Sequence, residues 1–451
     1  MKNKKDIIKS DKKHVWHPFT QMKEYENADP LVIVKGEGVY LYDIDGNKYL
    51  DAISSWWVNT LGHSNKRLND ALTRQANTIE HMIFAGFTHP WAVELAEKLV
   101  NLTDNNFQKV FYSDNGSTAV EVALKMAYQY WQQSGHPNKT KFVALKNSYH
   151  GDTIGAVSVG GVDLYHKIFK PLLFDIYQAD SPSCYRCSDS KENGSCENSC
   201  IVSVEDILKE HSEEIAAIII EPLIQAAGGM IIYPKEYLTN LRALCDKYNI
   251  LLIDDEVAMG FGRTGKMFAY QHAQIVPDIM CLAKGITAGY MPLSVTMTSE
   301  KIYNAFWDDW DKFKTFFHGH SYTANPLSIA VALENLKILE EDKIIEKNIK
   351  KAERIKAGLE KFKTLKNVGD VRQLGMVAAV ELVTDKPAKI SYDYKLRMAK
   401  KVCDFAQKNG LIIRPLGDVI YFMPPYIITS EEIDFMLNTA FNAIKTVCQA
   451  K

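Results

Sequence analysis

Two short apolar runs, each ending in charged residues, most constrain what this chain can fold into. The first, ILLID at 250–254, continues into Asp255 and Glu256, and the second, DIMCLA at 278–283, is followed by Lys284. A continuous apolar run rich in branched side chains is typical of a strand buried on both faces of a parallel sheet. The carboxyl ends of parallel strands meet at one edge of the sheet, where such sheets bind ligands. We therefore expect Asp255 and Lys284 to lie together at that edge.

Two interpretations of this pair are open from the residues alone. It could be a structural ion pair at the rim of a sheet. It could also hold a cofactor that carries an aldehyde and a pyridine ring, because a lysine amine forms a Schiff base with the aldehyde. The carboxylate would keep the ring nitrogen protonated, so that the ring can accept electrons.

Strand-like and helix-like segments alternate through the middle of the chain. A helical pattern begins at STAVEVALKMA (117–127) and ends near Gly135, and a second, charged helical stretch begins near residue 335. Alternation of this kind predicts an α/β fold, with a mostly parallel central sheet and helices on both faces. The runs that we predict as central strands are 109–113, 141–145, 216–222, 250–254, 278–283 and 293–299.

The ends of the chain differ from this pattern. An Asp45–Gly46 pair between alternating apolar runs predicts a hairpin. Short strands are expected at 377–383 and 411–415, after the charged helical stretch. We therefore predict that residues 1–60 contribute to a small domain, that 61–334 form a large domain, and that 335–451 form the rest of the small, α+β domain.

Composition excludes several classes of protein. The formal net charge is −2, which gives no bulk attraction to nucleic acid or an anionic membrane. The basic N-terminus lacks the apolar stretch of a secretory signal, and no window approaches 18 consecutive apolar residues. These features lead us to expect a cytoplasmic protein without a membrane span.

Four of the eight cysteines form a C-x2-C-x8-C-x3-C cluster in a polar segment. The spacing is close to that of a structural zinc site, although its second half is loose and contains no histidine. Free thiols are the other interpretation, and catalysis does not need a metal here. The cluster consists of Cys184, Cys187, Cys196 and Cys200.

The segment from Ile250 to Lys284, with GFGRTG at 260–265, resembles the cofactor-lysine region of the class III aminotransferases. Those enzymes belong to the fold-type I family that uses pyridoxal 5′-phosphate, and each is a dimer of subunits with a large and a small domain. The resemblance implies that Lys284 carries the cofactor and that Asp255 contacts its pyridine nitrogen. It also implies a homodimer with the active site at the interface.

Further cofactor contacts follow from the same resemblance. SDNGST, from Ser113, ends a strand and starts a helix, which suits either a phosphate or an ordinary helix cap. The family places its phosphate here, at Gly116 and Ser117. Tyr149 corresponds to the aromatic residue that stacks on the ring, and Ser321 to a hydroxyl that reaches the phosphate of the neighbouring subunit. Other roles stay open for His150 and Asp152, which follow Tyr149 and could orient their loop, cap a backbone group or act in catalysis. Glu221, at the end of another strand, could cap a backbone group or join the active site.

Three other segments resemble the branch of this family that serves biotin biosynthesis. They are VWHPFTQM (15–22), AISSWWVNTLGH (52–63) and IIRPLGDVIYFMPPYII (412–428). The substrate of that branch is 8-amino-7-oxononanoate, a long aliphatic chain with a carboxylate at one end. Burying its methylenes is worth about 0.8 kcal/mol each, and an arginine would hold the carboxylate. The resemblance places the substrate against Phe19, Trp56, Tyr149, Lys284, Gly319, Arg414 and Tyr421, with Trp57 beside them.

Several alternatives stay open at this point. The tryptophans could be core residues, Arg414 could form a structural salt bridge, and Arg263 could contact substrate or brace its loop. Phe19 stands where adenosylmethionine-using members have tyrosine, so the amino donor is either S-adenosylmethionine or lysine. The expected reaction is ping-pong transamination. The alternatives are another class III aminotransferase or aminomutase, acting on ornithine, 4-aminobutyrate or β-alanine, and an inactive scaffold.

Overall fold

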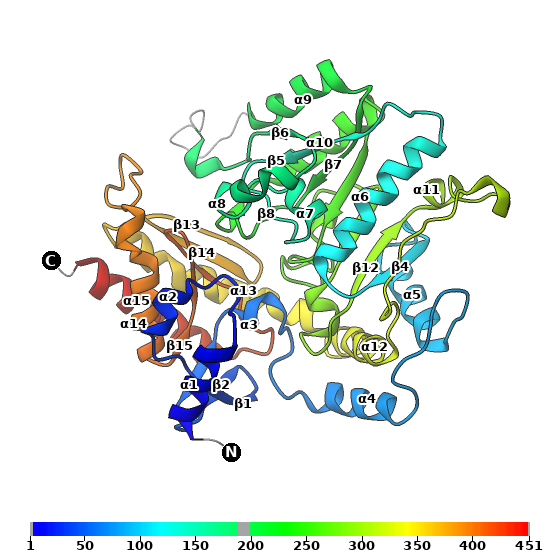
Figure 1. The fold of residues 1–451 in the computed structure, drawn as a ribbon. Coiled ribbons are helices and arrows are strands. Elements are labelled where there is room, and N and C mark those ends of the chain that lie inside the picture. Colours follow the sequence, from blue (N-terminus) through cyan, green and yellow to red (C-terminus); the bar gives the residue numbers. More distant parts are fainter. Residues whose placement is uncertain (1–2, 188–198, 450–451) are drawn as a thin grey trace.

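A seven-stranded sheet organises the protein, whose computed structural model describes residues 3–187 and 199–449 (Figure 1). The strands from β11 to β6 run parallel, whereas β12 is antiparallel to both of its neighbours. The predicted mostly parallel sheet is therefore confirmed. In sheet order the strands are β4 (Lys109–Ser113), β12 (Ser294–Thr298), β11 (Ile279–Leu282), β10 (Leu251–Asp255), β7 (Ile215–Ile220), β5 (Lys141–Leu145) and β6 (Tyr177–Ala179).

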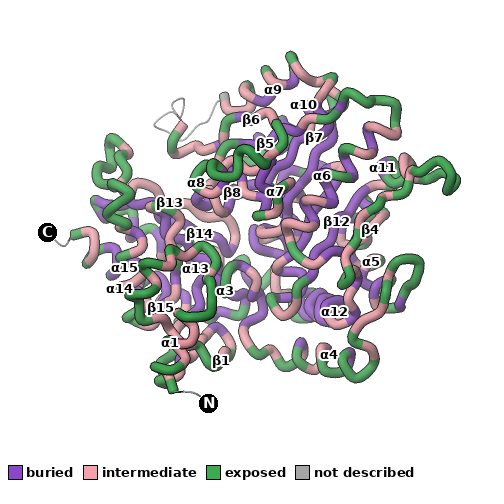
Figure 2. The backbone as a smooth tube through the Cα atoms, in the orientation of Figure 1, coloured by how far each residue is buried: buried purple, intermediate pink, exposed green. Residues whose placement is uncertain are grey.

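Helices cover both faces of this sheet because its central strands are apolar on both sides. Every residue of β7 is buried, and from Ala217 to Ile220 successive residues alternate between two separate cores. Ile219 packs in the core that contains α6 (Gly116–Gln133), and Ile220 packs in the core that contains α10 (Lys235–Lys247). Figure 2 shows the strands as the most buried part of the chain. The continuous apolar runs in the sequence thus indicated two-sided burial correctly.

The remaining helices of the first 341 residues surround the sheet or precede it. Among the helices that the structure describes, none is both long and apolar enough to cross a membrane. The remaining helices of the first 341 residues are α1 (Lys4–His14), α2 (Met22–Glu26), α3 (Ser54–Trp57), α4 (Lys66–Ala76), α5 (Pro90–Leu102), α7 (Ile154–Ser158), α8 (Asp163–His166), α9 (Ser199–His211), α11 (Glu300–Asn304) and α12 (Pro326–Glu341).

The C-terminal part forms a second, antiparallel sheet covered by helices (Figure 1). The elements are β13 (Val368–Leu374), β14 (Val377–Leu382), β17 (Val419–Phe422) and β16 (Arg414–Leu416) in sheet order, with α13 (Ile344–Leu359), α14 (Met398–Lys408) and α15 (Ser430–Gln449).

The N-terminal hairpin joins the C-terminal part through one strand. The strands β2 (Tyr40–Asp43) and β3 (Lys48–Asp51) pair antiparallel around the Asp45–Gly46 turn, as predicted, and Gly46 has a φ of +85°. The short strand β15 (Leu411–Ile412) pairs parallel with β3, and β1 (Ile33–Glu37) completes that sheet. Residues near both ends of the chain therefore share a sheet, while the exact domain boundaries at 60 and 334 stay a prediction.

Two strand predictions need correction. The run 109–113 is not central but forms the edge strand β4, where Phe111 is covered by Phe316 at a ring distance of 5.5 Å. The run 411–415 is not one strand, because β15 pairs with β3 and β16 pairs with β17 in a different sheet. In both cases the apolar pattern indicated a strand but could not identify the sheet or the partner strand to which it belongs.

Candidate active site

The structure brings Asp255 and Lys284 together at the carboxyl rim of the large sheet. The strands β10 and β11 are parallel neighbours, and Asp255 lies opposite Cys281, three residues before Lys284. Both Asp255 and Lys284 line a cavity of about 530 Å³. The predicted neighbourhood of the two residues is therefore present, and the cavity is large enough for a small-molecule ligand.

Lys284 has a left-handed backbone and an amine with a lowered pKa. Its backbone is left-handed, with a φ of +47°, and its Nζ lies 5.1 Å from the centre of the Trp57 ring. Burial lowers the pKa of the amine, against the opposing effect of Asp255 and Glu221. A left-handed lysine costs on the order of 1 kcal/mol, and such strain gathers at functional sites. The lowered pKa increases the fraction of neutral amine, which is the nucleophilic form.

Asp255 is fixed by a buried histidine. Its Oδ2 lies 2.6 Å from Nδ1 of His150, and its Oδ1 accepts a hydrogen bond from the backbone N–H of Val257 at 3.1 Å. His150 directly follows the predicted ring-stacking residue, and sequence reasoning had left its role open. The structure makes it the partner that orients Asp255, so the carboxylate can face a protonated ring nitrogen in the cavity.

The neighbouring acid Asp254 differs from Asp255. Successive side chains of a strand point to opposite faces, so Asp254 leaves β10 on the side away from Asp255. Neither carboxyl oxygen of Asp254 has a hydrogen-bond partner among the described residues, and burial raises the pKa of this group well above its usual value. Burial therefore favours the neutral form of Asp254. Asp255 is the carboxylate that the cavity presents.

Glu221 forms part of the cavity wall. It follows β7, and its carboxyl accepts hydrogen bonds from the backbone N–H of Tyr149 at 3.0 Å and of Ala226 at 2.9 Å. Burial raises the pKa of Glu221 to about 7, and the negative charge of Asp255 adds to that shift. The sequence left a capping role and an active-site role open, and the structure combines them, because Glu221 caps the Tyr149 backbone beside the cavity.

The other end of the cavity fits a phosphate. The helix α6 begins at Gly116, and the Asn115 side chain caps it by accepting the N–H of Thr118 at 3.1 Å. That cap leaves the first two N–H groups of the helix, those of Gly116 and Ser117, available to an anion. Both residues line the cavity, and a Cβ on Gly116 would lie only 2.6 Å from Val257. An amine, a carboxylate and a helix N-terminus around one cavity fit the groups of pyridoxal 5′-phosphate.

An aromatic cluster lies beside the cavity. Its inner member is Tyr149, which lines the cavity and whose hydroxyl donates to Asp152 at 2.7 Å. Tyr165 packs 6.2 Å from Tyr149, and Phe19 packs 5.4 Å from Tyr165 and 5.6 Å from Trp56. The sequence did not reveal Tyr165, because VDLYH has no pattern that distinguishes a site residue from an ordinary surface tyrosine.

Arg414 completes this cluster. Its guanidinium lies 4.8 Å from the centre of the Trp56 ring. The side chain is exposed, and it forms no ion pair within the described part of the chain. The open alternative of a structural salt bridge therefore has no support among these residues. Arg414 is a positive charge available to a ligand.

The tandem tryptophans have different positions. Trp57 is buried and lines the cavity, whereas Trp56 is more than one-third exposed. Tyr421 is buried behind Trp57, with its ring 6.0 Å away, and does not itself line the cavity. Its expected substrate contact thus stays a prediction, and the structure shows Tyr421 supporting Trp57.

Arg263 braces this wall. It is almost fully buried and donates hydrogen bonds to the carbonyl oxygens of Trp57 at 3.1 Å and Pro424 at 3.0 Å. Burial lowers the pKa of Arg263, and its guanidinium lies 4.9 Å from the centre of the Tyr426 ring. Of the two roles that the sequence left open, the structure favours bracing.

Other predicted residues lie apart from the cavity. Gly319 and Ser321 lie in the segment 314–325, outside the cavity wall, and Ser321 is exposed. The four-cysteine cluster falls partly on residues 188–198, outside the described part of the chain, so the possible zinc site stays untested. Within the described part, no group of three or more potential metal ligands is present.

Comparison with known proteins identifies the family. A model of the family "Aminotransferase class-III" matches residues 21–444. An adenosylmethionine-8-amino-7-oxononanoate aminotransferase from Geobacter sulfurreducens is 48% identical over 438 residues, which cover 97% of each chain. The enzyme of the same name from Staphylococcus aureus is 46% identical over 448 residues, covering 99% of this chain and 98% of its own.

Solved structures agree with this assignment. The adenosylmethionine-8-amino-7-oxononanoate aminotransferase of Methanocaldococcus jannaschii superposes with a TM-score of 0.93 at 42% identity, covering 99% of this chain and all of its own. An omega transaminase from Pseudomonas jessenii in complex with PMP also gives 0.93, but at 34% identity, with 98% of each chain covered. The fold is thus common to both kinds of enzyme, and the sequence is closer to the first.

Proposed function

This chain belongs to the class III aminotransferases, which depend on pyridoxal 5′-phosphate, and on that premise we propose that it aminates 8-amino-7-oxononanoate to 7,8-diaminononanoate. One structural observation carries the proposal. Phe19, Trp56 and Arg414 come from three distant segments of the chain, and all three meet beside the cavity. Each segment had been singled out from the sequence for its resemblance to the biotin-biosynthesis branch.

The chemistry of this cluster suits the substrate. A long aliphatic chain needs apolar surface, which the rings of Phe19, Trp56 and Tyr165 supply. Its remote carboxylate needs a cation, and Arg414 is exposed beside those rings. A guanidinium binds a carboxylate through two parallel hydrogen bonds, which fixes the orientation of the substrate as well as its affinity.

The residues around the cavity then have distinct roles in a ping-pong transamination. Bound pyridoxal 5′-phosphate supplies an aldehyde that receives the amino group and a ring that takes up electrons. Lys284 would hold the cofactor through its amine, and its free amine would move a proton at the substrate carbon. Asp255, oriented by His150, keeps the ring nitrogen protonated. Gly116 and Ser117 would hold the phosphate, and Tyr149 would stack on the ring.

The second candidate is another class III aminotransferase or an aminomutase. It would use the same cofactor residues, and the omega transaminase structures show that the fold does not separate the two. The Arg414 cluster favours the first candidate. The two are separated by offering the aminated enzyme either 8-amino-7-oxononanoate or succinic semialdehyde. Reaction with the aldehyde alone would overturn the proposed substrate.

The amino donor is S-adenosylmethionine or lysine. The names of the relatives favour adenosylmethionine. Phe19 lacks the hydroxyl that a tyrosine would place at the entrance, and this suits lysine, the slimmer of the two donors. The effect is small, because a hydrogen bond is worth only about 0.5–1.5 kcal/mol. Each donor is mixed separately with the cofactor-loaded enzyme, and the visible absorbance of the cofactor is followed. The donor that shifts it is the substrate, and a shift by neither would refute both.

A homodimer is the third part of the proposal. Large aromatic side chains are exposed along the segment 307–322, and the ring contact of His81 with Tyr322 at 5.3 Å joins its end to the segment that carries the exposed Ile83 and Phe87. An apolar surface of this kind marks a protein interface. We propose that a second copy covers it and that Ser321 reaches the partner's phosphate. The exposed rings are Trp307, Trp310, Phe313, Phe317 and Tyr322.

This arrangement is tested by analytical ultracentrifugation at micromolar concentration. The enzyme should sediment as a dimer, whereas an active monomer would contradict the shared site. We also propose that the enzyme is cytoplasmic, as the sequence leads us to expect.

A further inference from the structure

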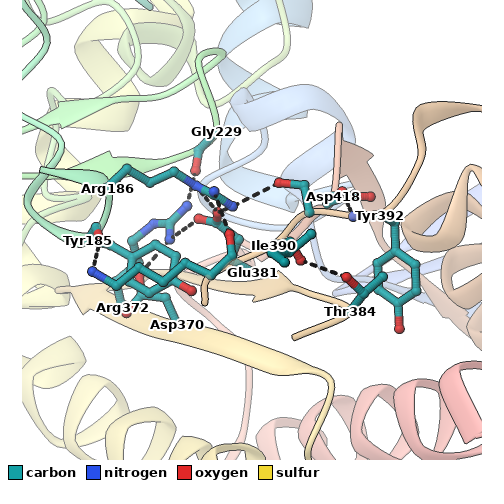
Figure 3. Close-up of polar contacts among 12 residues, drawn as sticks. Tyr185, Arg186, Gly229, Asp370, Arg372, Glu381, Thr384, Ile390, Tyr392 and Asp418 are labelled. Carbon is teal, nitrogen blue, oxygen red and sulfur yellow. Dashed lines mark hydrogen bonds and ion pairs between the residues drawn. The ribbon is translucent and has the colours of Figure 1, made fainter. Parts of the chain in front are cut away.

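A charged network joins the C-terminal sheet to two segments of the large domain (Figure 3). Its centre is Arg372 on β13, which donates to Asp370 at 2.6 Å and to Glu381 at 2.8 Å. The same guanidinium donates to the backbone carbonyl oxygens of Gly229 at 2.6 Å and Met230 at 2.7 Å. One side chain of the small domain thus clamps a turn of the large domain.

Arg186 binds the other side of the network. It donates twice to Oε1 of Glu381, at 2.6 and 2.8 Å (Figure 3). It also donates to the carbonyl oxygen of Lys389 and to Ser391. Within the described part of the chain, Arg186 forms no hydrogen bond or ion pair with residues 226–230, so the two arginines share Glu381 but differ in their other partners. This difference supplies a matched control.

The clamped turn leads directly to the cavity. The N–H groups of Gly229 and Met230 donate to the carbonyl oxygen of Ala226, at 3.1 and 2.8 Å. The N–H of Ala226 donates to Glu221, whose other carboxyl oxygen accepts the N–H of Tyr149. A continuous series of hydrogen bonds therefore runs from Arg372 to the backbone of Tyr149.

The turn 226–230 has a strained backbone and packs against the segment before Tyr149. Gly229 and Met230 have φ values of +119° and +51°, and the left-handed conformation of Met230 costs on the order of 1 kcal/mol. A Cβ on Gly228 would lie 2.2 Å from the carbonyl oxygen of Asn147, two residues before Tyr149. The turn is therefore strained and packs against the segment that carries Tyr149, so that its displacement moves the cavity wall.

We propose that Arg372 is a positioning residue for the cofactor ring, because it holds the turn 226–230 and, through Glu221, the backbone of Tyr149. The inference rests on the proposed stacking of Tyr149 on the ring. It makes the contact between the two domains part of the cofactor site, so that the small domain affects the orientation of the ring as well as the binding of substrate.

The titration of Glu221 reports on this connection. The ionisable groups that face its carboxyl are His150, Asp255, Lys284 and Tyr233. The N–H of Ala226 favours the ionised form of Glu221, so loss of that hydrogen bond raises the pKa further. A lost hydrogen bond to a charged group corresponds to a shift of about one pH unit.

The experiment compares Arg372→Ala with Arg186→Ala in the cofactor-loaded enzyme without amino substrate. The readouts are the visible circular dichroism of the bound cofactor, which depends on ring orientation, and its pH midpoints. We expect Arg372→Ala to weaken the band about two-fold or more and to move one midpoint upward by about one unit, and Arg186→Ala to leave both near wild type. Equal changes in both variants, or none in Arg372→Ala, would overturn the proposal.

Two further variants keep the test decisive. If Arg372→Ala does not fold, Arg372→Lys replaces it, since lysine keeps the charge but cannot span both carbonyl groups; it should give a smaller shift, and wild-type spectra would overturn the proposal. Tyr149→Leu tests the underlying assumption separately. An unchanged band in that variant would refute the stacking of Tyr149, whatever the behaviour of Arg372, and substrate choice does not enter any of these readouts.

Discussion

The replacement of Arg263 by lysine tests how the cavity wall is held. The backbone of residues 54–57 is left-handed throughout, with φ values between 44° and 77°, at a cost of roughly 1–2 kcal/mol per residue. The hydrogen bond from Arg263 to the Trp57 carbonyl oxygen helps to hold that strained segment. The second hydrogen bond, to Pro424, ties the segment to the chain that follows β17.

The expected loss follows from these two bonds. Lysine can keep one of them, so one charge-assisted bond worth about 1.5–3 kcal/mol is lost and one buried carbonyl group is left unpaired, at about 1–3 kcal/mol. We expect Arg263→Lys to lower the free energy of unfolding by about 2.5–6 kcal/mol. Because Trp57 lies against Lys284, a shifted wall should also lower kcat, by up to about 100-fold for a displacement near 1 Å.

Urea unfolding and steady-state kinetics check this prediction together. The control is Arg354→Lys, because Arg354 pairs with Asp434 on the surface and such pairs contribute about 0–1 kcal/mol. A raised KM with unchanged stability and kcat would refute bracing, and it would show instead that Arg263 contacts substrate.

Four further predictions address the site itself. Lys284→Ala should abolish turnover, and borohydride reduction of the wild type followed by peptide mapping should place the cofactor on Lys284 and on no other lysine. Asp255→Asn should still bind cofactor but react about 10³-fold or more slowly, as loss of several kcal/mol of stabilisation requires, and near-normal rates would show that the wrong carboxylate was chosen. Arg414→Ala should impair the half-reaction with 8-amino-7-oxononanoate by roughly 2–5 kcal/mol and spare the donor half-reaction, whereas equal losses would indicate folding damage. Glu221 binds its proton more tightly in the folded state, with a pKa of about 7 against 4.5, so its contribution to stability is present below pH 4.5 and is lost as pH rises to 7; the unfolding free energy of the cofactor-free protein should fall by about 3 kcal/mol more across that window in the wild type than in Glu221→Gln.

The sequence predicted the elements whose chemistry is local. Apolar runs that end in Asp255 and Lys284 identified two parallel strands, because burial on both faces leaves a continuous pattern. The start of α6 at Gly116 was predicted to within one residue, at Ser117, since a helix cap uses few residue types. These features depend on neighbours in the chain, so the sequence displays them directly.

Features that depend on distant contacts were not visible. Tyr165 approaches Phe19 only because α8 folds beside the N-terminal segment, and nothing near Tyr165 in the sequence indicates this. The pairing of His150 with Asp255 joins residues 105 positions apart. The role of Arg263 likewise could not be decided from the sequence, because it depends on where the carbonyl groups of Trp57 and Pro424 lie.

The most direct test of the account is a single turnover with the proposed acceptor. The enzyme is first converted to its aminated cofactor form, freed of donor, and mixed with 8-amino-7-oxononanoate, and the product is identified by mass spectrometry. The account predicts about one equivalent of 7,8-diaminononanoate per active site and return of the original cofactor spectrum. Failure of this ketone to react, with rapid reaction of succinic semialdehyde under the same conditions, would contradict it.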